Sequence, residues 1–191
     1  PGHIAVFTPS YAMLNDIIGN EIWHGRRVMM EESGWSKQRI DSLLRDMEMS
    51  RSAGEKILLG GVFSAKLGEG IDYKRNLLDA VVCIGLPLAP PSVELNARKD
   101  YYEERFGRSK SYRWAVLQPA VNALMQAMGR PIRKMGDRAF ILLLEERLLM
   151  PQFKRLLPSN MNVLTVANEE STKRHVKRFF KRHPEPASGD E

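Results

Sequence analysis

Residues 3–17, HIAVFTPSYAMLNDI, open the chain with a short apolar run that ends at Pro9 and is followed by a helical pattern from Ser10 onward. The apolar run over 3–8 predicts a buried strand, and a polar residue ahead of the next apolar positions predicts the start of a helix. A buried strand followed directly by a helix is the repeating unit of α/β domains.

The rest of the chain repeats this unit. Residues that cap helices, such as Ser36, precede amphipathic segments, and glycines such as Gly54 follow them. Strands are predicted over 3–8, 26–32, 55–63, 77–87 and 138–146, and helices over 36–54, 92–107 and 119–129, with Pro119 in the first turn of the last helix. The alternation predicts an α/β domain with a mostly parallel sheet, helices on both faces and ligands at the carboxyl ends of the strands.

Composition limits the classes of site. Cys83 is the only cysteine, so the chain has no internal disulfide and no cysteine-ligated cluster, and its apolar neighbours predict a buried side chain. The four histidines are scattered without ligand spacing, and we expect no metal site. No apolar run approaches the roughly 18 residues of a membrane span, and no secretory leader is present. We expect a soluble, intracellular protein, cytoplasmic in a prokaryote or nuclear in a eukaryote. A first residue other than methionine suggests a piece of a longer chain.

The net charge of +6 favours a polyanionic partner. Half of the excess lies from Lys173 onward, where KRHVKRFFKRH (173–183) places six Lys and Arg around two phenylalanines. We expect a basic helix over about 168–182, followed by a tail, HPEPASGDE, whose composition predicts disorder. The helix has two interpretations: it grips single-stranded nucleic acid by charge and stacking, or it docks its aromatic edge on the domain.

Two arginines lie three residues apart in QAMGRPIR (126–133), at the end of a predicted helix. Gln126 and Arg130 lie four residues apart and share one polar face. Pro131 is expected to draw Arg130 away from helical dihedrals, so that the chain turns outward carrying Arg130 and Arg133. Such guanidinium groups can bind phosphate oxygens and stabilise a transferred phosphoryl group. The alternative is a solvated helix end whose cations favour the helix dipole.

The segment GVFSAKLGEGIDY (61–73) runs from a strand into a glycine-containing loop. Glycines let backbone approach a ligand closely, and Asp72 after the turn could accept hydrogen bonds from a ribose hydroxyl. Ser64 and Lys66 could hold a nucleic-acid phosphate. The alternative is an ordinary turn between two strands.

In VFTPSY (6–11), Ser10 and Tyr11 lie where a strand ends and a helix begins, which is a favourable place for an anion. The alternative for Ser10 is a helix cap with no ligand.

Together these segments resemble motifs IV, V and VI of superfamily 2 helicases, specifically of the XPD/DinG-like branch. VFTPSY resembles motif IV, SAKLGEGIDY resembles the branch's GK-x-SEGIDF motif V, and QAMGRPIR resembles the Q-x-x-GR-x-IR of motif VI. The stretches at 85–107 and 142–158 also match the family pattern, and the resemblance covers roughly residues 3 to 160. It implies a second RecA-like motor domain over 1–165, followed by the basic helix and tail over 166–191.

The resemblance also implies roles for individual residues. Arg130 and Arg133 would be arginine fingers on the γ-phosphate of ATP, with Gln126 in the same cleft. Asp72, supported by the Gly68 and Gly70 turn around Glu69, would approach the nucleotide. The residues expected to lie toward the DNA backbone are Ser10, Tyr11, Ser64 and Lys66.

The chain departs from the family pattern in three ways. Ala65 and Gly68 replace the glycine and serine expected in motif V. No G-x-x-x-x-G-K-[ST] phosphate cradle occurs, and FILLLEE (140–146) resembles a Walker B strand only superficially, so Glu145 and Glu146 are expected to be structural. ATP, Mg²⁺ and any iron–sulfur cluster would therefore be held mainly by an N-terminal RecA-like domain of the same parent protein.

The leading hypothesis is the C-terminal motor domain of an ATP-dependent 5′-to-3′ DNA helicase that binds single-stranded DNA and is inactive as this fragment alone. One alternative is a non-catalytic nucleic-acid-binding scaffold with a RecA-like fold. Another is a helicase of a different branch that acts on RNA, which the GEGIDY and GRPIR forms disfavour.

Overall fold

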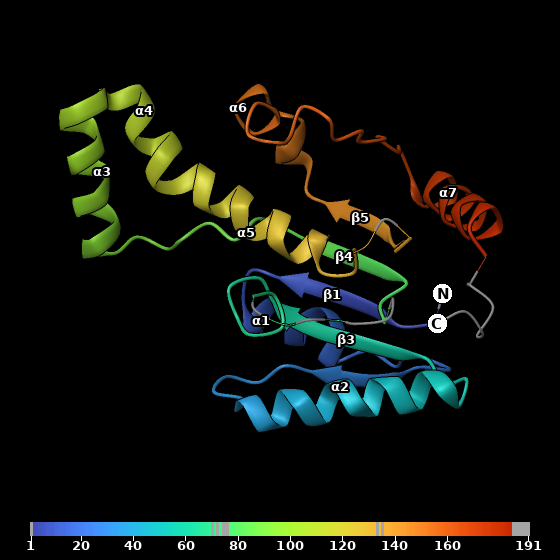
Figure 1. Ribbon diagram of the computed structural model, residues 1–191. Helices are drawn as coiled ribbons and strands as arrows, with labels where there is room; N and C mark the ends of the chain where they lie inside the picture. Colours follow the sequence, from blue (N-terminus) through green and yellow to red (C-terminus); the bar gives the residue numbers. More distant parts are fainter. Residues whose placement is uncertain are drawn as a thin grey trace.

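A single parallel sheet organises the molecule (Figure 1). The computed structural model describes residues 2–69, 71, 73, 77–132, 134 and 136–184. Within them the strands are β1 (Ile4–Thr8), β2 (Arg27–Met30), β3 (Ile57–Val62), β4 (Ala80–Ile84) and β5 (Phe140–Leu144), in the sheet order β2-β3-β1-β4-β5. All five predicted strands are present and parallel, and each is shorter than the range predicted for it.

Helices cover both faces of the sheet, as predicted (Figure 1). The helical segments are α1 (Tyr11–Leu14), η1 (Asn15–Gly19), α2 (Lys37–Ser52), α3 (Val93–Phe106), α4 (Arg108–Tyr112), η2 (Arg113–Leu117), α5 (Gln118–Gly129), η3 (Glu146–Leu149), α6 (Pro151–Lys154) and α7 (Glu169–Arg182). Helices α2 and α5 pack on one face, where Phe7 and Leu59 belong to the main core. On the other face, Leu14 and Ile18 of α1 and η1 pack against Val6. The result is a three-layer α/β domain.

Side-chain caps fix where several helices begin. The hydroxyl of Ser36 accepts a hydrogen bond from Arg39 N at the start of α2, and Ser92 caps α3 in the same way. At α7, Asn168 and Ser171 form a reciprocal capping box, so the predicted basic helix is confirmed. Of the predicted disordered tail, residues 185–191 lie outside the described part of the chain.

The segment before α5 differs from the prediction. Residues 108–117 are helical and continuous with α5, so Pro119 lies inside a long helix rather than in a first turn. A proline inside a helix clashes with the carbonyl four residues back and cannot donate to it. Here η2 forms a widened turn in which Gln118 N donates to Arg113 O, and the wider turn accommodates the proline.

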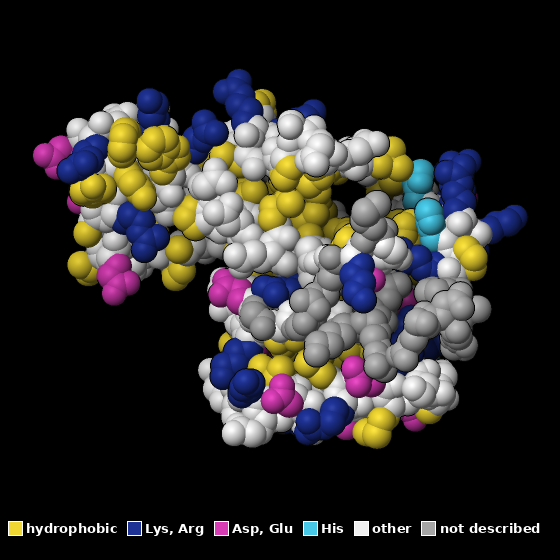
Figure 2. Space-filling model, in the orientation of Figure 1, with side chains coloured by type: hydrophobic (Ala, Val, Ile, Leu, Met, Phe, Trp, Pro, Cys, Tyr) yellow, Lys and Arg dark blue, Asp and Glu magenta, His cyan; other side chains and the backbone are white. Residues whose placement is uncertain are grey.

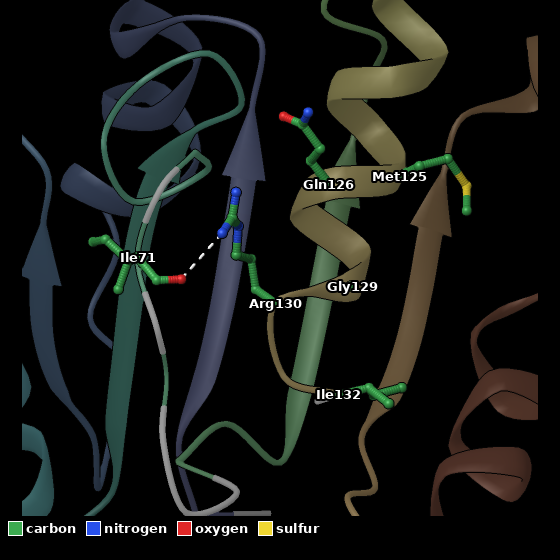
Figure 3. Close-up of a pocket in the computed structure, with 6 residues that line it drawn as sticks. All are labelled: Ile71, Met125, Gln126, Gly129, Arg130 and Ile132. Carbon is green, nitrogen blue, oxygen red and sulfur yellow. Dashed lines mark hydrogen bonds between the residues drawn. The ribbon is translucent and has the colours of Figure 1, made fainter. Parts of the chain in front are cut away.

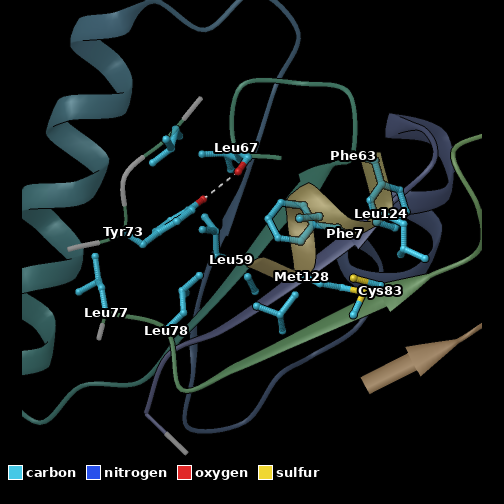
Figure 4. Close-up of a cluster of buried hydrophobic side chains, with 14 of the residues drawn as sticks. Phe7, Leu59, Phe63, Leu67, Tyr73, Leu77, Leu78, Cys83, Leu124 and Met128 are labelled. Carbon is cyan, nitrogen blue, oxygen red and sulfur yellow. Dashed lines mark hydrogen bonds between the residues drawn. The ribbon is translucent and has the colours of Figure 1, made fainter. Parts of the chain in front are cut away.

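The connection from β3 to β4, predicted as a glycine-containing loop, contributes buried side chains to the core. Leu67, Ile71, Tyr73 and Leu77 are buried in the main cluster between the sheet and its covering helices (Figure 4). The Tyr73 hydroxyl donates a 3.3 Å hydrogen bond to the Leu67 carbonyl. Burial raises the pKa of Tyr73 far above its usual range. Apolar packing of these four side chains therefore holds the described part of the connection in place.

A buried polar network closes the opposite edge of the sheet, where β1 begins. His3 Nδ1 accepts from Ile57 N at 3.2 Å, and His3 Nε2 donates to Met47 O at 2.9 Å. The backbone N–H of His3 donates to Asp79, which pairs with Arg51 at 3.0 Å. Desolvation of the buried ring lowers the pKa of His3, and neighbouring Arg51 adds to that effect. The imidazole is neutral in the fold.

No helix among the described residues is long and apolar enough to cross a membrane. Cys83 is buried on β4, as predicted, and burial raises the pKa of its thiol to about 12. Within the described ranges, no group of three or more His, Cys, Asp or Glu side chains could hold a metal ion.

Candidate functional site

Arg130 lies at the end of α5, and its side chain contacts the loop that follows β3 (Figure 3). Its Nε donates a 2.9 Å hydrogen bond to the Gly68 carbonyl, and its Nη1 donates a 3.1 Å hydrogen bond to the Ile71 carbonyl. No carboxylate in the described part of the chain forms an ion pair with Arg130. The guanidinium is therefore turned toward the GEGID segment and is held there by backbone oxygens.

The backbone at Arg130 corrects one prediction. Pro131 was expected to draw Arg130 out of helical dihedrals, but Arg130 has φ −56° and ψ −41°. Arg130 N donates to Ala127 O and Ile132 N donates to Gly129 O, so a tighter turn follows the helix directly. The helix ends where predicted, yet the chain folds inward, because Pro131 is buried rather than projecting into solvent.

A pocket of about 430 Å³ opens beside Arg130. Its walls come from the last turns of α5 and from the loop after β3, and the lining residues are Ile71, Met125, Gln126, Gly129, Arg130 and Ile132. Gln126 lies one turn before Arg130 on the same side of the helix and is exposed (Figure 3). The structure thus brings Gln126 and Arg130 to one pocket. Arg133, the second predicted finger, lies outside the described residues.

Gly68 is required for chain packing. A Cβ at this position would lie 2.2 Å from the Phe63 carbonyl oxygen and 2.7 Å from the Val62 carbonyl oxygen. Only glycine lets the loop pass this close to the end of β3. The glycine is therefore needed for a contact within the chain, and not for the close approach of a ligand. Glu69 is exposed next to it. Gly70 and Asp72, which the sequence assigned to the nucleotide, lie outside the described residues.

Glu31 anchors the start of the same loop, a role that no sequence motif indicated. Its carboxylate accepts hydrogen bonds from Val62 N at 3.1 Å and from Leu67 N at 3.0 Å, and the residue is 3% exposed. Burial raises the pKa of Glu31, although the hydrogen bonds from Leu67 and Val62 partly oppose that shift. Glu31 is therefore a buried acceptor that holds both ends of the turn containing Ser64 and Lys66.

A second pocket, of about 280 Å³, lies where β2 and β3 end. It is lined by Tyr11, Glu31, Glu32, Gly34, Trp35, Val62, Ser64, Ala65 and Lys66. Three of the four residues predicted to face nucleic acid, Tyr11, Ser64 and Lys66, therefore share one pocket. Ser10 does not line it: its hydroxyl accepts from Met13 N and caps α1. Lys66 Nζ donates to the Trp35 carbonyl at 2.6 Å.

The first of the two acidic residues after β5, Glu145, is bound by a neighbouring arginine. Glu145 accepts hydrogen bonds from the Arg147 guanidinium at 2.7 and 2.5 Å and from its backbone N–H at 2.9 Å. The Arg147 side chain is the main cause of the lowered pKa of Glu145. Glu145 is thus engaged within the chain, as expected for a structural residue.

Comparison with known proteins identifies this arrangement. The helicase C-terminal domain model matches residues 1–163. The chain is 28% identical over 148 residues to the ATP-dependent DNA helicase XPD of Sulfolobus acidocaldarius, covering 76% of this chain and 25% of that protein. It is 32% identical over 167 residues to the ATP-dependent DNA helicase CHL1 of Meyerozyma guilliermondii, covering 77% and 20%. The solved structure named XPD_APO superposes with a TM-score of 0.60 and 27% identity, over 86% of this chain and 33% of that one.

Proposed function

Because the chain belongs to the helicase C-terminal domain family, we propose that it is the second motor domain of an ATP-dependent DNA helicase that moves 5′ to 3′. The chain spans a quarter or less of the length of its XPD and CHL1 relatives. The complete activity therefore involves further parts of a parent polypeptide, including an N-terminal RecA-like domain.

The observation that carries this proposal is the placement of Arg130. A guanidinium has more N–H donors than the carbonyls of Gly68 and Ile71 use, so donors remain for a phosphate at the 430 Å³ pocket. The two carbonyls also fix the side chain before any ligand arrives, which reduces the conformational entropy lost on binding. In this proposal Arg130 and Arg133 stabilise charge on the transferred phosphoryl group, and Gln126 contacts the nucleotide.

The residues present define what this chain contributes to ATP. The sequence has no glycine-rich phosphate cradle, and the described residues include no carboxylate cluster suited to Mg²⁺. The pocket offers an arginine, a glutamine and apolar walls. We propose that this chain supplies positive charge to one side of the nucleotide, with Glu69, Gly70 and Asp72 nearby, while the N-terminal domain holds most of ATP and its metal ion. Any iron–sulfur cluster belongs to that other part as well.

Single-stranded DNA is proposed to pass the second pocket. Ser64 and Lys66 lie on the turn that Glu31 secures, so their backbone is fixed and their polar groups are exposed. The Lys66 ammonium and the Ser64 hydroxyl are suited to phosphate oxygens. Tyr11 offers a ring at the same pocket. Ser10 contributes by capping α1, which sets the position of Tyr11.

The test uses the full-length parent protein. Arg130→Ala is expected to lower DNA-stimulated ATP turnover by about 10³-fold or more, the usual effect of losing an arginine finger. Binding of a single-stranded oligonucleotide is expected to change by less than about twofold, because the variant leaves the second pocket intact. Arg45→Ala, at an exposed position on α2, serves as the matched control. Near-normal turnover in Arg130→Ala would remove Arg130 from the catalytic role, and the isolated chain is expected to hydrolyse essentially no ATP.

A further inference from the structure

Helix α7 lies beyond the part of the chain that the family model matches, and it carries an exposed cationic stripe. The stripe consists of Lys173, Arg174, Lys177, Arg178, Lys181 and Arg182, all exposed. Lys173 pairs with Glu169 at 2.6 Å, and the described residues provide no carboxylate partner for the other five. No acidic residue occurs between 171 and 184. Figure 2 shows Lys and Arg side chains projecting at the end of the molecule where α7 lies.

The aromatic side of α7 is packed on the domain. The rings of Phe179 and Phe140, the first residue of β5, have centroids 5.5 Å apart. Phe180 and His183 pack on Phe179 in turn, at 5.1 and 5.0 Å. These contacts fix the rotation of the helix and turn the cationic stripe away from the sheet. They also occupy the rings that would otherwise stack on bases.

Neither interaction with the helix dipole nor the usual charge pattern of a solvated helix accounts for the cationic stripe. Favourable interaction with the helix dipole is limited to about the last turn, which includes Lys181 and Arg182. The other four cations lie in the first turns and middle of the helix. A solvated helix usually alternates charges, as α2 does, where Asp41, Asp46 and Glu48 separate the cations. An uncompensated row of like charges raises the electrostatic energy of the free protein and favours a polyanionic partner.

We propose that the cationic stripe of α7 binds the phosphate backbone of duplex DNA. Lys173 and Arg182 are separated by about 14 Å along the helix axis, at about 1.5 Å per residue, and a duplex carries one charge per about 1.7 Å of its axis. Preference for single strands requires exposed aromatic platforms, and in α7 the Phe179 ring packs on Phe140 and the Phe180 ring packs on Phe179. The affinity of a nucleic acid for the cationic stripe therefore depends on the charge density of that nucleic acid, which is higher in a duplex than in a single strand.

This surface is separate from the pocket proposed for single-stranded DNA. Phe140 begins β5, whereas Ser64 follows the end of β3, and in a parallel sheet these positions lie at opposite edges (Figure 1). The inference rests on the charge and packing of α7 and does not depend on ATP hydrolysis by the parent protein. A motor with this arrangement would hold duplex and single strand at two ends of one domain.

The test compares two variants of this chain that lose the same charge. The first, Lys177→Gln/Arg178→Gln/Lys181→Gln, removes half of the cationic stripe and keeps a good helix former at each position. The second, Lys37→Gln/Arg45→Gln/Lys56→Gln, removes three exposed cations elsewhere. Binding of a fluorescent duplex and of a single strand of equal length is measured by anisotropy over a range of salt concentrations. Circular dichroism checks that both variants fold.

The expected result is a tenfold or greater loss of duplex affinity in the α7 variant, with a salt dependence shallower by about 2 to 3 in log–log slope. The control is expected to stay within about twofold of the wild type. Equal losses in both variants, or tighter binding of the single strand through α7, would overturn the inference. Binding of phosphatidylserine vesicles that depends on the stripe, with duplex binding unchanged, would reassign α7 to a membrane surface. Failure of Arg130→Ala to affect turnover would leave this result standing.

Discussion

Gly68→Ala tests how tightly the loop after β3 is joined to the sheet. The added Cβ would lie 2.2 Å from the Phe63 carbonyl oxygen, whereas ordinary contacts begin at 3.4 Å, so the loop must move by about 1 Å. Both nearby oxygens belong to backbone that is fixed by β3, so rotation of a side chain cannot relieve the contact.

The same displacement strains the bond to Arg130. The Arg130 Nε to Gly68 O distance is 2.9 Å, and a displacement that lengthens it by about 1 Å takes it beyond hydrogen-bonding range. Overpacking costs about 1–3 kcal/mol, and loss of a hydrogen bond to a charged group costs about 1.5–3 kcal/mol. We expect Gly68→Ala to lower the free energy of unfolding by about 3–5 kcal/mol, a large part of the stability of a typical domain.

Urea denaturation of the chain, followed by tryptophan fluorescence and circular dichroism, measures this loss. Gly136→Ala is the matched control, since its Cβ would meet nothing within 4 Å, and its stability is expected to lie within about 1 kcal/mol of the wild type. Combining Gly68→Ala with Arg130→Ala should cost less than the sum of the two single variants, because both remove the same bond. A Gly68→Ala stability within about 0.5 kcal/mol of the control, or strict additivity of the pair, would refute the proposed contact.

Two further predictions concern buried titratable groups. Glu31→Gln should destabilise the chain by about 1–3 kcal/mol, because Val62 N and Leu67 N bind different carboxylate oxygens and an amide replaces one of these acceptors with a donor. The exposed neighbour is the control: Glu32→Gln should cost less than about 0.5 kcal/mol in the same urea assay. Equal effects of the two substitutions would contradict the role assigned to Glu31. Because the pKa of His3 is lowered in the folded chain, the unfolded chain binds a proton at this position before the folded chain does as pH falls below about 6.5. The free energy of unfolding should therefore decline from there toward the folded-state pKa, and His3→Gln should show a shallower decline between about pH 6.5 and 5. An unchanged slope would exclude His3 as the cause.

Much of the fold follows from local patterns that the sequence displays directly. The apolar runs predicted the five strands, because parallel strands that are buried on both faces show continuous apolar sequence rather than alternating apolar and polar residues. The hydroxyl of Ser36 gave the start of α2 because few residues can accept from the free N–H groups of a first helical turn. The proximity of Arg130 to the GEGID segment was also predictable, although only through resemblance, since the two are far apart in sequence.

The remaining features depend on tertiary contacts that no short window contains. Glu31 and Glu32 are adjacent and chemically identical, and only the fold shows that Glu31 is buried against Val62 and Leu67. A proline such as Pro119 is typical of a helix start, yet the widened turn η2 accommodates it inside a longer helix. At Arg130 the local rule for a residue before proline yields to the packing of Pro131. At Arg130 the burial of Pro131 outweighs the local preference, and at Pro119 the hydrogen bonding of the widened turn does so.

The loop after β3 is held by two charged side chains that come from different elements. Glu31 holds its beginning beside the 280 Å³ pocket, and Arg130 holds its later part beside the 430 Å³ pocket. The two anchors meet at the consecutive residues Leu67 and Gly68, and the Leu67 side chain is embedded in the core. Each of the two pockets therefore borders a stretch of this loop that a charged side chain from another element holds in position.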